Sequence, residues 1–282
     1  MSLPSTRWPR AARAIRAAAD TWNSIGEQMA FYIQGIAGIR DALIYYRKET
    51  IRVIAHMSLG VGALAMIGGT VAIVAFLTAN TGFLIAIVGY SQLSNLGVEA
   101  LIGFLAAYAN TRFVAALISA IALAATIGAG ATAQLGAMRI NEEIDALEVI
   151  GVRAVAYLVS TRILAGAVIA IPLGCVALLI GWLAAGLVVH FGYGQSSGVY
   201  GHYFNTFLAP TDVFWTLIEV TLQAIAVMLV CTYYGFNASG GPAGVGAATG
   251  RAVRTSLLVL TVITLGAGLA LYGRSGNFHL SG

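Results

Sequence analysis

Long apolar runs alternate with short polar stretches along the chain. Five runs have about the length of a membrane span, at about 54–78, 113–136, 158–189, 213–236 and 253–272. About 20 apolar residues cross a bilayer as an α-helix, whereas a membrane β-barrel would show alternating segments of about 10 residues. We therefore expect an all-α integral membrane protein with about five transmembrane helices.

The stretch 83–111 departs from this pattern, because polar residues from Tyr90 to Glu99 separate two short apolar parts. Neither part is long enough to cross a membrane alone, so the stretch could be a sixth, polar span or a re-entrant segment. With five spans, 13 of the 15 Lys and Arg residues fall on the side of the N-terminus, in the N-terminal arm and the connections 137–162 and 237–254. The connection 190–212 has none. Because basic residues concentrate on the cytoplasmic side, we expect five spans, a re-entrant segment and a cytoplasmic N-terminus.

The N-terminal arm has the pattern of an amphipathic helix over residues 7–30. Trp8 and Trp22 lie on an apolar stripe with a spacing of seven, and Arg10, Arg13 and Arg16 lie off it. A basic helix with Trp anchors is typical of a helix that lies on an anionic leaflet, although it could instead pack on a soluble partner. We divide the chain into an arm (1–52), a membrane domain (53–273) and a short tail (274–282).

Composition excludes a soluble protein. Hydrophobic residues make up 59% of the chain, charged residues only 9%, and the mean hydropathy is +0.86. A soluble domain carries about 25% charged residues, so this surface belongs in lipid.

The sequence offers no pattern for catalysis or metal binding. Cys175 and Cys231 lie in apolar runs without disulfide or metal spacing, and the four histidines are scattered. The glycine-rich stretch 237–250 lacks the Gly-Lys-Ser/Thr of a phosphate-binding loop. We expect no enzyme activity, no metal or other cofactor on this chain, and no nucleic-acid partner.

The connection 139–151, RINEEIDALEVIG, carries the most information about function. Asn141 can cap a helix, the acids after it suit the first turn, and Gly151 is a natural terminator. Ile144 and Leu147 begin an apolar edge. A short acidic helix on a basic face could dock into a groove of another protein, or it could be a well-capped connector. Spacing alone supports both interpretations equally.

Three segments resemble the MlaE/YrbE permease family. GAGATAQLGAMRINEEIDALEVIG, from Gly128 to Gly151, is similar to the family's A-x-x-G-x-M-R-x-x-E-x-I-D-A-L-E-V-x-G signature. Arg162–Leu173, RILAGAVIAIPL, and Gly241–Ser256, GPAGVGAATGRAVRTS, also fit, and the resemblance covers about 40–272. The Arg-rich arm resembles the YrbE permeases of mycobacterial Mce systems, in particular the B-type subunit.

The resemblance implies a permease of an inner-membrane ABC transporter that moves lipids such as fatty acids, mycolic acids, sterols or phospholipids. A separate ATPase subunit would bind ATP and Mg. The implied partners are a second, non-identical permease, MCE-domain proteins on the outer face and membrane lipids. The acidic connection would be the cytoplasmic coupling helix that sits on the ATPase. Its implied contact residues are Glu142, Glu143, Asp145, Ala146, Leu147 and Glu148.

Tyr90 and Glu99 match a G-Y…E element of the family, and we expect Glu99 to be the one acid near membrane depth away from the cytoplasmic face. An intramembrane carboxylate marks a functional site, here the mouth of a lipid cavity, although Glu99 could instead be exposed to water. The chain departs from the family at Ala109–Phe113, where relatives have R-E-x-x-P, and near Thr126, where they carry an Arg. A scaffold that anchors MCE proteins is therefore one alternative. A stand-alone secondary carrier is another, but we find neither an intramembrane charge for ion coupling nor an internal repeat.

Overall fold

A computed structural model describes residues 22, 25–59 and 63–272. Five of its helices are long and apolar enough to cross a membrane, which confirms the expected number of spans in the described part of the chain. α4 (Ala63–Asn95), α11 (Pro210–Phe236) and α12 (Gly241–Tyr272) are continuous α-helices. The other two spans, Glu99–Ile140 and Val155–Gly192, contain wider π turns. Their α-helical parts are α5 (Ile102–Ala109), α6 (Ala115–Leu123), α7 (Ala129–Ile140) and α9 (Thr161–Leu187).

Three shorter helices precede the bundle: residues 25–37, α2 (Ile39–Ile44) and α3 (Arg47–Leu59). The predicted first span at 54–78 is wrong, because it combines the end of α3 with the start of α4. Residues 60–62, between these two helices, lie outside the described residues.

The prediction of a re-entrant segment at 83–111 is also wrong. Residues up to Asn95 continue α4, and residues from Glu99 begin the next long helix. Only Leu96, Gly97 and Val98 turn the chain, with Gly97 in the left-handed region at φ 70°. The polar residues that divide the stretch therefore lie at the adjoining ends of two helices, and each apolar part lengthens its neighbouring span.

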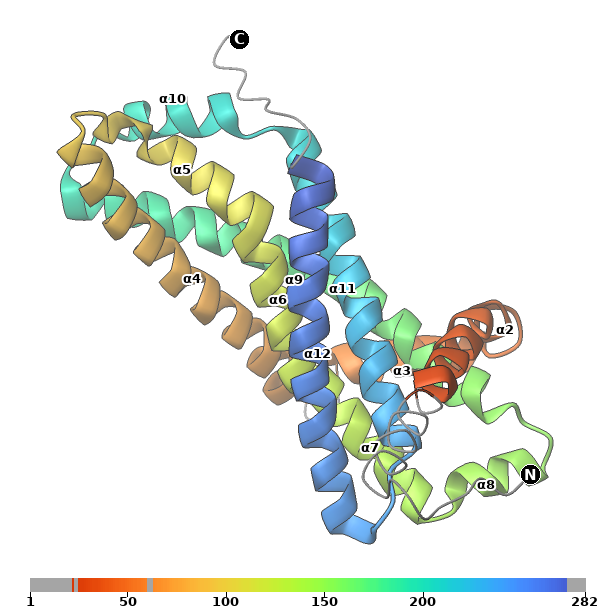
Figure 1. The fold of residues 1–282 in the computed structure, drawn as a ribbon. Coiled ribbons are helices and arrows are strands. Elements are labelled where there is room, and N and C mark those ends of the chain that lie inside the picture. Colours follow the sequence, from red (N-terminus) through yellow and green to blue (C-terminus); the bar gives the residue numbers. More distant parts are fainter. Residues whose placement is uncertain (1–21, 23–24, 60–62, 273–282) are drawn as a thin grey trace, which may run out of the picture.

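Two short helices mark opposite ends of the bundle. α8 (Glu143–Val149) joins α7 to α9, and α10 (Ser197–Phe207) joins α9 to α11 (Figure 1). We call these the α8 end and the α10 end. The turn between α11 and α12 belongs to the α8 end, as do α2 and α3, and the turn between α4 and α5 lies near α10.

The connections at the α8 end are shorter than predicted. The expected 237–254 connection is reduced to 237–240, and Arg251 and Arg254 are exposed residues of α12. Arg162 is buried in α9 instead of lying in a loop, and its Nη1 donates a hydrogen bond to the Leu158 carbonyl at 2.9 Å.

Small residues allow the central helices to pack closely. Gly235 of α11 lies so near α7 that a Cβ there would be 2.8 Å from the Thr132 carbonyl oxygen. The Thr132 hydroxyl also donates to the Cys231 carbonyl of α11 at 2.9 Å. Close backbone approach and side-chain hydrogen bonds are how helices associate in lipid, where no hydrophobic force drives them together.

Candidate functional site: the helix between α7 and α9

A residue in the left-handed backbone conformation lies on each side of α8 and separates it from the neighbouring helices. Glu142 has φ 60° and is the N-cap residue, so the expectation that Asn141 caps the helix is wrong. The Asn141 amide N–H still bonds to Ala137 of α7, because the chain reverses only at the next residue. Gly151, at φ 82°, ends the turn after α8 as predicted. Its N–H donates to Glu148 and that of Val152 to Leu147, both at 3.0 Å, the pattern of a Schellman C-cap.

One side chain anchors α8 to the bundle. Ile144 is fully buried against Leu135 of α7 and against Ala154 and Leu158 at the start of the third span. Leu147 is partly buried beside them. The predicted apolar edge is therefore only partly in the core, and α8 contacts the bundle mainly through Ile144.

The rest of α8 and its flanks forms an exposed acidic and apolar surface, which we call the α8 surface. It consists of Glu142, Glu143, Asp145, Ala146, Glu148, Val149 and Ile150. Val149 is 88% exposed and Ile150 is 73% exposed, which is more than a connector needs. Large apolar side chains surrounded by charges are typical of a protein–protein contact.

The charges of the α8 surface are only partly neutralised within the chain. Arg139 of α7 forms an ion pair with Asp145 at 2.6 Å. Among the described residues, Glu142 and Glu148 are in no ion pair. The surface therefore presents a negative charge to any protein that contacts it.

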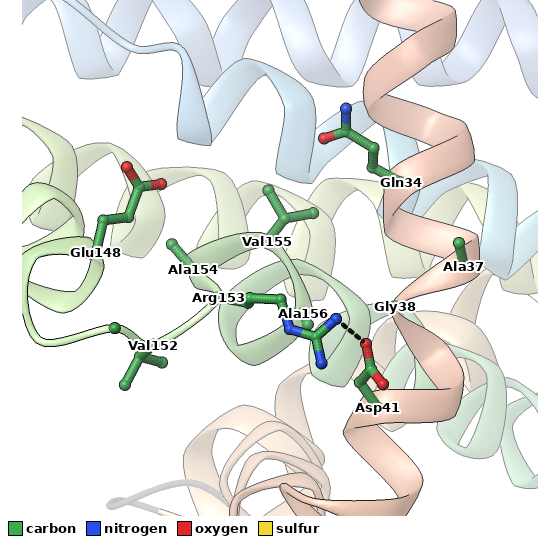
Figure 2. Close-up of a pocket in the computed structure, with 11 residues that line it drawn as sticks. Gln34, Ala37, Gly38, Asp41, Glu148, Val152, Arg153, Ala154, Val155 and Ala156 are labelled. Carbon is green, nitrogen blue, oxygen red and sulfur yellow. Dashed lines mark ion pairs between the residues drawn. The ribbon is translucent and has the colours of Figure 1, made fainter.

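A groove of about 540 Å³ separates α8 from the N-terminal helices. Gln34 and Asp41 line one wall, and Glu148 and the segment from Gly151 to Ala156 line the other (Figure 2). Arg153 reaches across it to Asp41 with an ion pair of 2.8 Å. The segment that follows α8 is thus tied to α2 by an ion pair, and α8 itself is tied to the core by Ile144.

Inside the bundle, the structure reveals a buried acid that the sequence analysis missed. Glu219 of α11 is 6% exposed and accepts a hydrogen bond of 3.0 Å from Gln223 Nε2. The same nitrogen donates to Thr264 Oγ1 of α12 at 3.0 Å. The expectation that Glu99 is the one acid near membrane depth is therefore wrong. The available signal was the pair of polar residues four apart, which share one face of an apolar helix.

One ion pair among the described residues joins two of the spans, Glu99–Ile140 and Pro210–Phe236. Arg112 forms an ion pair with Asp212 at 2.8 Å, and its guanidinium lies 4.4 Å from the centre of the Tyr108 ring. The expected absence of intramembrane charges, used against a secondary carrier, is therefore wrong.

Tyr90 and Glu99 lie at the α10 end. The Tyr90 ring stacks on Tyr193 at 4.0 Å, and the Glu99 carbonyl accepts a hydrogen bond of 3.4 Å from Gln195. One apolar pocket lies beside α3 and another between α9 and α10, and neither is lined by Tyr90 or Glu99. Their role at a lipid cavity stays a prediction.

Of the predicted membrane-surface arm, Trp22 is described and is exposed, which suits a membrane anchor. Trp8, Arg10, Arg13 and Arg16 lie outside the described residues. Within the described part, no three His, Cys, Asp or Glu side chains are grouped closely enough to hold a metal ion.

The fold defines a multi-pass membrane protein with a short, exposed acidic helix at one end of its bundle. The sequence model of the family described as Permease MlaE matches residues 61–269, so the chain belongs to the MlaE permease family.

Similar proteins point to the same class. A probable ABC transporter permease protein of Rickettsia bellii is 28% identical over 249 residues, which cover 84% of this chain and 93% of the relative. One of Rickettsia prowazekii is 30% identical over 73% of this chain and 80% of the relative. The intermembrane phospholipid transport system permease protein MlaE of Haemophilus influenzae is 27% identical over a stretch that covers 66% of this chain and 75% of the relative. The chain is an ABC transporter permease, a transport subunit and not an enzyme.

Proposed function

We propose that this chain is a lipid permease whose α8 surface docks into a groove of a separate ATPase. The observation that carries the proposal is the exposure of Val149 and Ile150 beside unpaired Glu142 and Glu148, on a helix anchored by Ile144. A short helix that is anchored mainly by Ile144 can transmit a movement of the partner to α7 and α9. This is because the span that contains α7 ends near Ile144 and the span that contains α9 begins near it.

The proposed cargo is a membrane lipid. The name of the Haemophilus influenzae relative supports a phospholipid, and the resemblance of the Arg-rich arm to mycobacterial YrbE permeases supports fatty acids, mycolic acids or sterols. An Mce-type complex would add a second, non-identical permease and MCE-domain proteins at the α10 end.

In this proposal the α8 end faces the cytoplasm and the chain lies in the inner membrane. The basic residues of α2, α3, α7 and α12 support that orientation, because such residues concentrate on the cytoplasmic side. ATP and Mg would be bound by the ATPase, and this chain would hold no cofactor.

A co-purification experiment tests the docking. The tagged chain is purified in mild detergent, in its native form and with Glu142, Glu143 and Glu148 changed to Lys. Bound proteins are identified by mass spectrometry. An ATPase should accompany the native chain and be lost from the variant, because three charge reversals oppose the partner's surface.

Glu27→Lys is the control, since Glu27 is an exposed acid on the N-terminal helix and does not belong to the α8 surface. It should retain the ATPase. A native chain that carries no ATPase would contradict the proposal and favour the secondary carrier. An ATPase that stays bound to the triple variant would place the contact elsewhere. Bound MCE proteins without lipid transport would favour the scaffold.

A further inference from the structure

The helix over residues 25–37 is joined to the start of a membrane span. Ser160 Oγ donates a hydrogen bond of 2.7 Å to the Gly35 carbonyl. A Cβ at Gly35 would also lie 3.3 Å from the Ile163 side chain. The span begins at Val155, so both contacts lie within about 12 Å of its start, at 1.5 Å per residue.

The same helix also contacts the end of a second span. The Phe31 ring lies 5.4 Å from Tyr233 and 5.5 Å from Phe236, measured between ring centres. Phe236 is the last residue of α11. Because one span begins and another ends beside it, the helix lies at the level where the spans leave the bilayer. Figure 1 shows it in red, crosswise to the long helices at the α8 end.

One side of this helix is a stripe of exposed apolar side chains. Ile25, Met29, Ile33 and Ile36 follow one another at a spacing of three or four, so they share a side of the helix. Each of them is about half exposed or more, and Trp22 before them is 76% exposed. At the level of the bilayer surface, such a stripe meets acyl chains, and Trp is the side chain most typical of that level.

The other sides of the helix face protein. Phe31 and Gly35 pack on the bundle, and Gln34 and Ala37 line the groove beside α8. Consecutive residues of an α-helix point about 100° apart, so the apolar stripe is directed away from both the bundle and the groove. The helix therefore has the arrangement of an amphipathic helix that lies in a bilayer surface.

The charges near the stripe indicate which lipid it meets. Arg40, Arg47 and Lys48 are exposed and form no ion pair among the described residues. Of the three acids between residues 25 and 59, only Glu27 is exposed. Exposed basic residues at this level are attracted to anionic lipid headgroups, whereas a neutral leaflet would offer them no net charge.

We propose that helix 25–37, α2 and α3 form a surface that binds an anionic lipid leaflet. The apolar stripe contacts the acyl chains, and Arg40, Arg47 and Lys48 contact the lipid phosphates. The occupant is the membrane that the spans themselves cross. The proposal does not depend on the ATPase contact, so it stands or falls separately from the proposed function.

Spin labels on adjacent residues test where the stripe points. Cys175 and Cys231 are changed to Ala, and the full chain carries either Ile33→Cys or Gln34→Cys as the labelled site. Both proteins are placed in vesicles of equal parts of phosphatidylcholine and phosphatidylglycerol. The label at position 33 should be relaxed mainly by oxygen, which dissolves in lipid, and the label at 34 mainly by a nickel chelate, which stays in water. Equal access of the nickel chelate to both labels would overturn the proposal and leave the stripe for a soluble protein.

Hydrogen exchange tests the preference for anionic lipid. The full chain is compared in nanodiscs of phosphatidylcholine and in nanodiscs that also contain phosphatidylglycerol. Exchange over residues 25–44 should slow at least about fivefold with phosphatidylglycerol, the factor that one basic residue contributes near an anionic surface. Changing Arg40, Arg47 and Lys48 together to Gln should remove this slowing. Changing Arg251 and Arg254 to Gln is the control, because these exposed residues belong to α12, and the slowing should remain.

Equal exchange in the two kinds of nanodisc would overturn the proposal, as would a slowing that survives the triple substitution. High salt gives a test on the native chain if the triple variant does not fold. Salt screens exposed charges, so the slowing caused by phosphatidylglycerol should disappear at about 1 M salt. A slowing that is unchanged by salt would show that the lipid charge does not act on these residues.

Discussion

At the scale of single residues, burial distinguishes side chains that hold the fold from those that the proposed function assigns to a partner contact. Ile144 and Val149 are both apolar residues of α8, yet the first is fully buried and the second almost fully exposed. Exposing Val149 has no benefit for the isolated chain, whereas burying Ile144 fixes the helix. The two residues therefore allow anchoring and docking to be tested separately.

Ile144→Ala should release α8 from the bundle. Truncating a buried Ile to Ala costs about 2–5 kcal/mol, and α8 has no other fully buried side chain to compensate. Hydrogen exchange should show faster exchange over residues 143–149, with the five spans unchanged. Val149→Ala should leave exchange unchanged and weaken ATPase binding. Equal protection of α8 in Ile144→Ala would show that the ion pairs Arg139–Asp145 and Arg153–Asp41 are enough to hold it.

Glu219 should tolerate an amide better than an alkyl side chain. Gln at position 219 keeps an oxygen that accepts a hydrogen bond from Gln223. Leu removes this acceptor and leaves the buried amide of Gln223 with one hydrogen bond fewer. Glu219→Leu should lower the free energy of unfolding by about 1–2 kcal/mol, and Glu219→Gln by less. Thermal unfolding in detergent measures both. If Glu219→Gln is stable but transports no lipid, the carboxyl group itself is needed, as is common for intramembrane acids.

At the scale of elements, the ends of a helix determine where a polar surface points. Glu142 and Gly151 both take left-handed backbone conformations, so α8 is turned away from α7 before it and from the third span after it. Glycine adopts this conformation without strain, whereas a residue with a Cβ is disfavoured by about 1–2 kcal/mol.

Gly151→Ala should therefore loosen the end of α8. A Cβ at Gly151 meets no atom within 4 Å, so the expected loss of about 1–2 kcal/mol is purely conformational. Hydrogen exchange at the backbone N–H groups of Gly151 and Val152 should become faster, since both groups donate hydrogen bonds to carbonyls of α8. Gly130→Ala is the matched control, because Gly130 also has open space but lies within α7. There alanine should stabilise the helix by about 0.5–1 kcal/mol.

The sequence predicted helices more reliably than their ends. Hydropathy predicted the number of spans, and the acids and Gly151 predicted the α8 helix, because apolar content and helix-end residues are local properties. Hydropathy placed the first span too early in the chain and divided the hairpin around Gly97, since polar residues at the tips of long helices resemble a break. Glu219 escaped notice because its burial depends on Gln223 and on Thr264 of another helix. Contacts between helices that are far apart in sequence are not encoded in local patterns.

At the scale of the whole molecule, an odd number of spans separates the two ends. α8 follows the second long helix and α10 follows the third, so one membrane crossing lies between them. The α8 surface and α10 would then face opposite sides of the bilayer. This arrangement is what a transporter needs if ATP is hydrolysed on one side and lipid is exchanged near the other.

Cysteine labelling tests this arrangement in intact cells. The native Cys175 and Cys231 are first changed to Ala, and a single cysteine replaces either Glu148 beside the α8 groove or His202 of α10, both of which are exposed. A membrane-impermeant maleimide should label His202→Cys in intact cells and Glu148→Cys only after the membrane is opened, because the orientation proposed from the basic residues places the α8 end in the cytoplasm. The reverse labelling pattern would show that the α8 end lies outside the cytoplasm, where the proposed ATPase contact could not form. Labelling of both sites from outside would mean that Val155–Gly192 does not cross the membrane, and the five-span topology would fail with it.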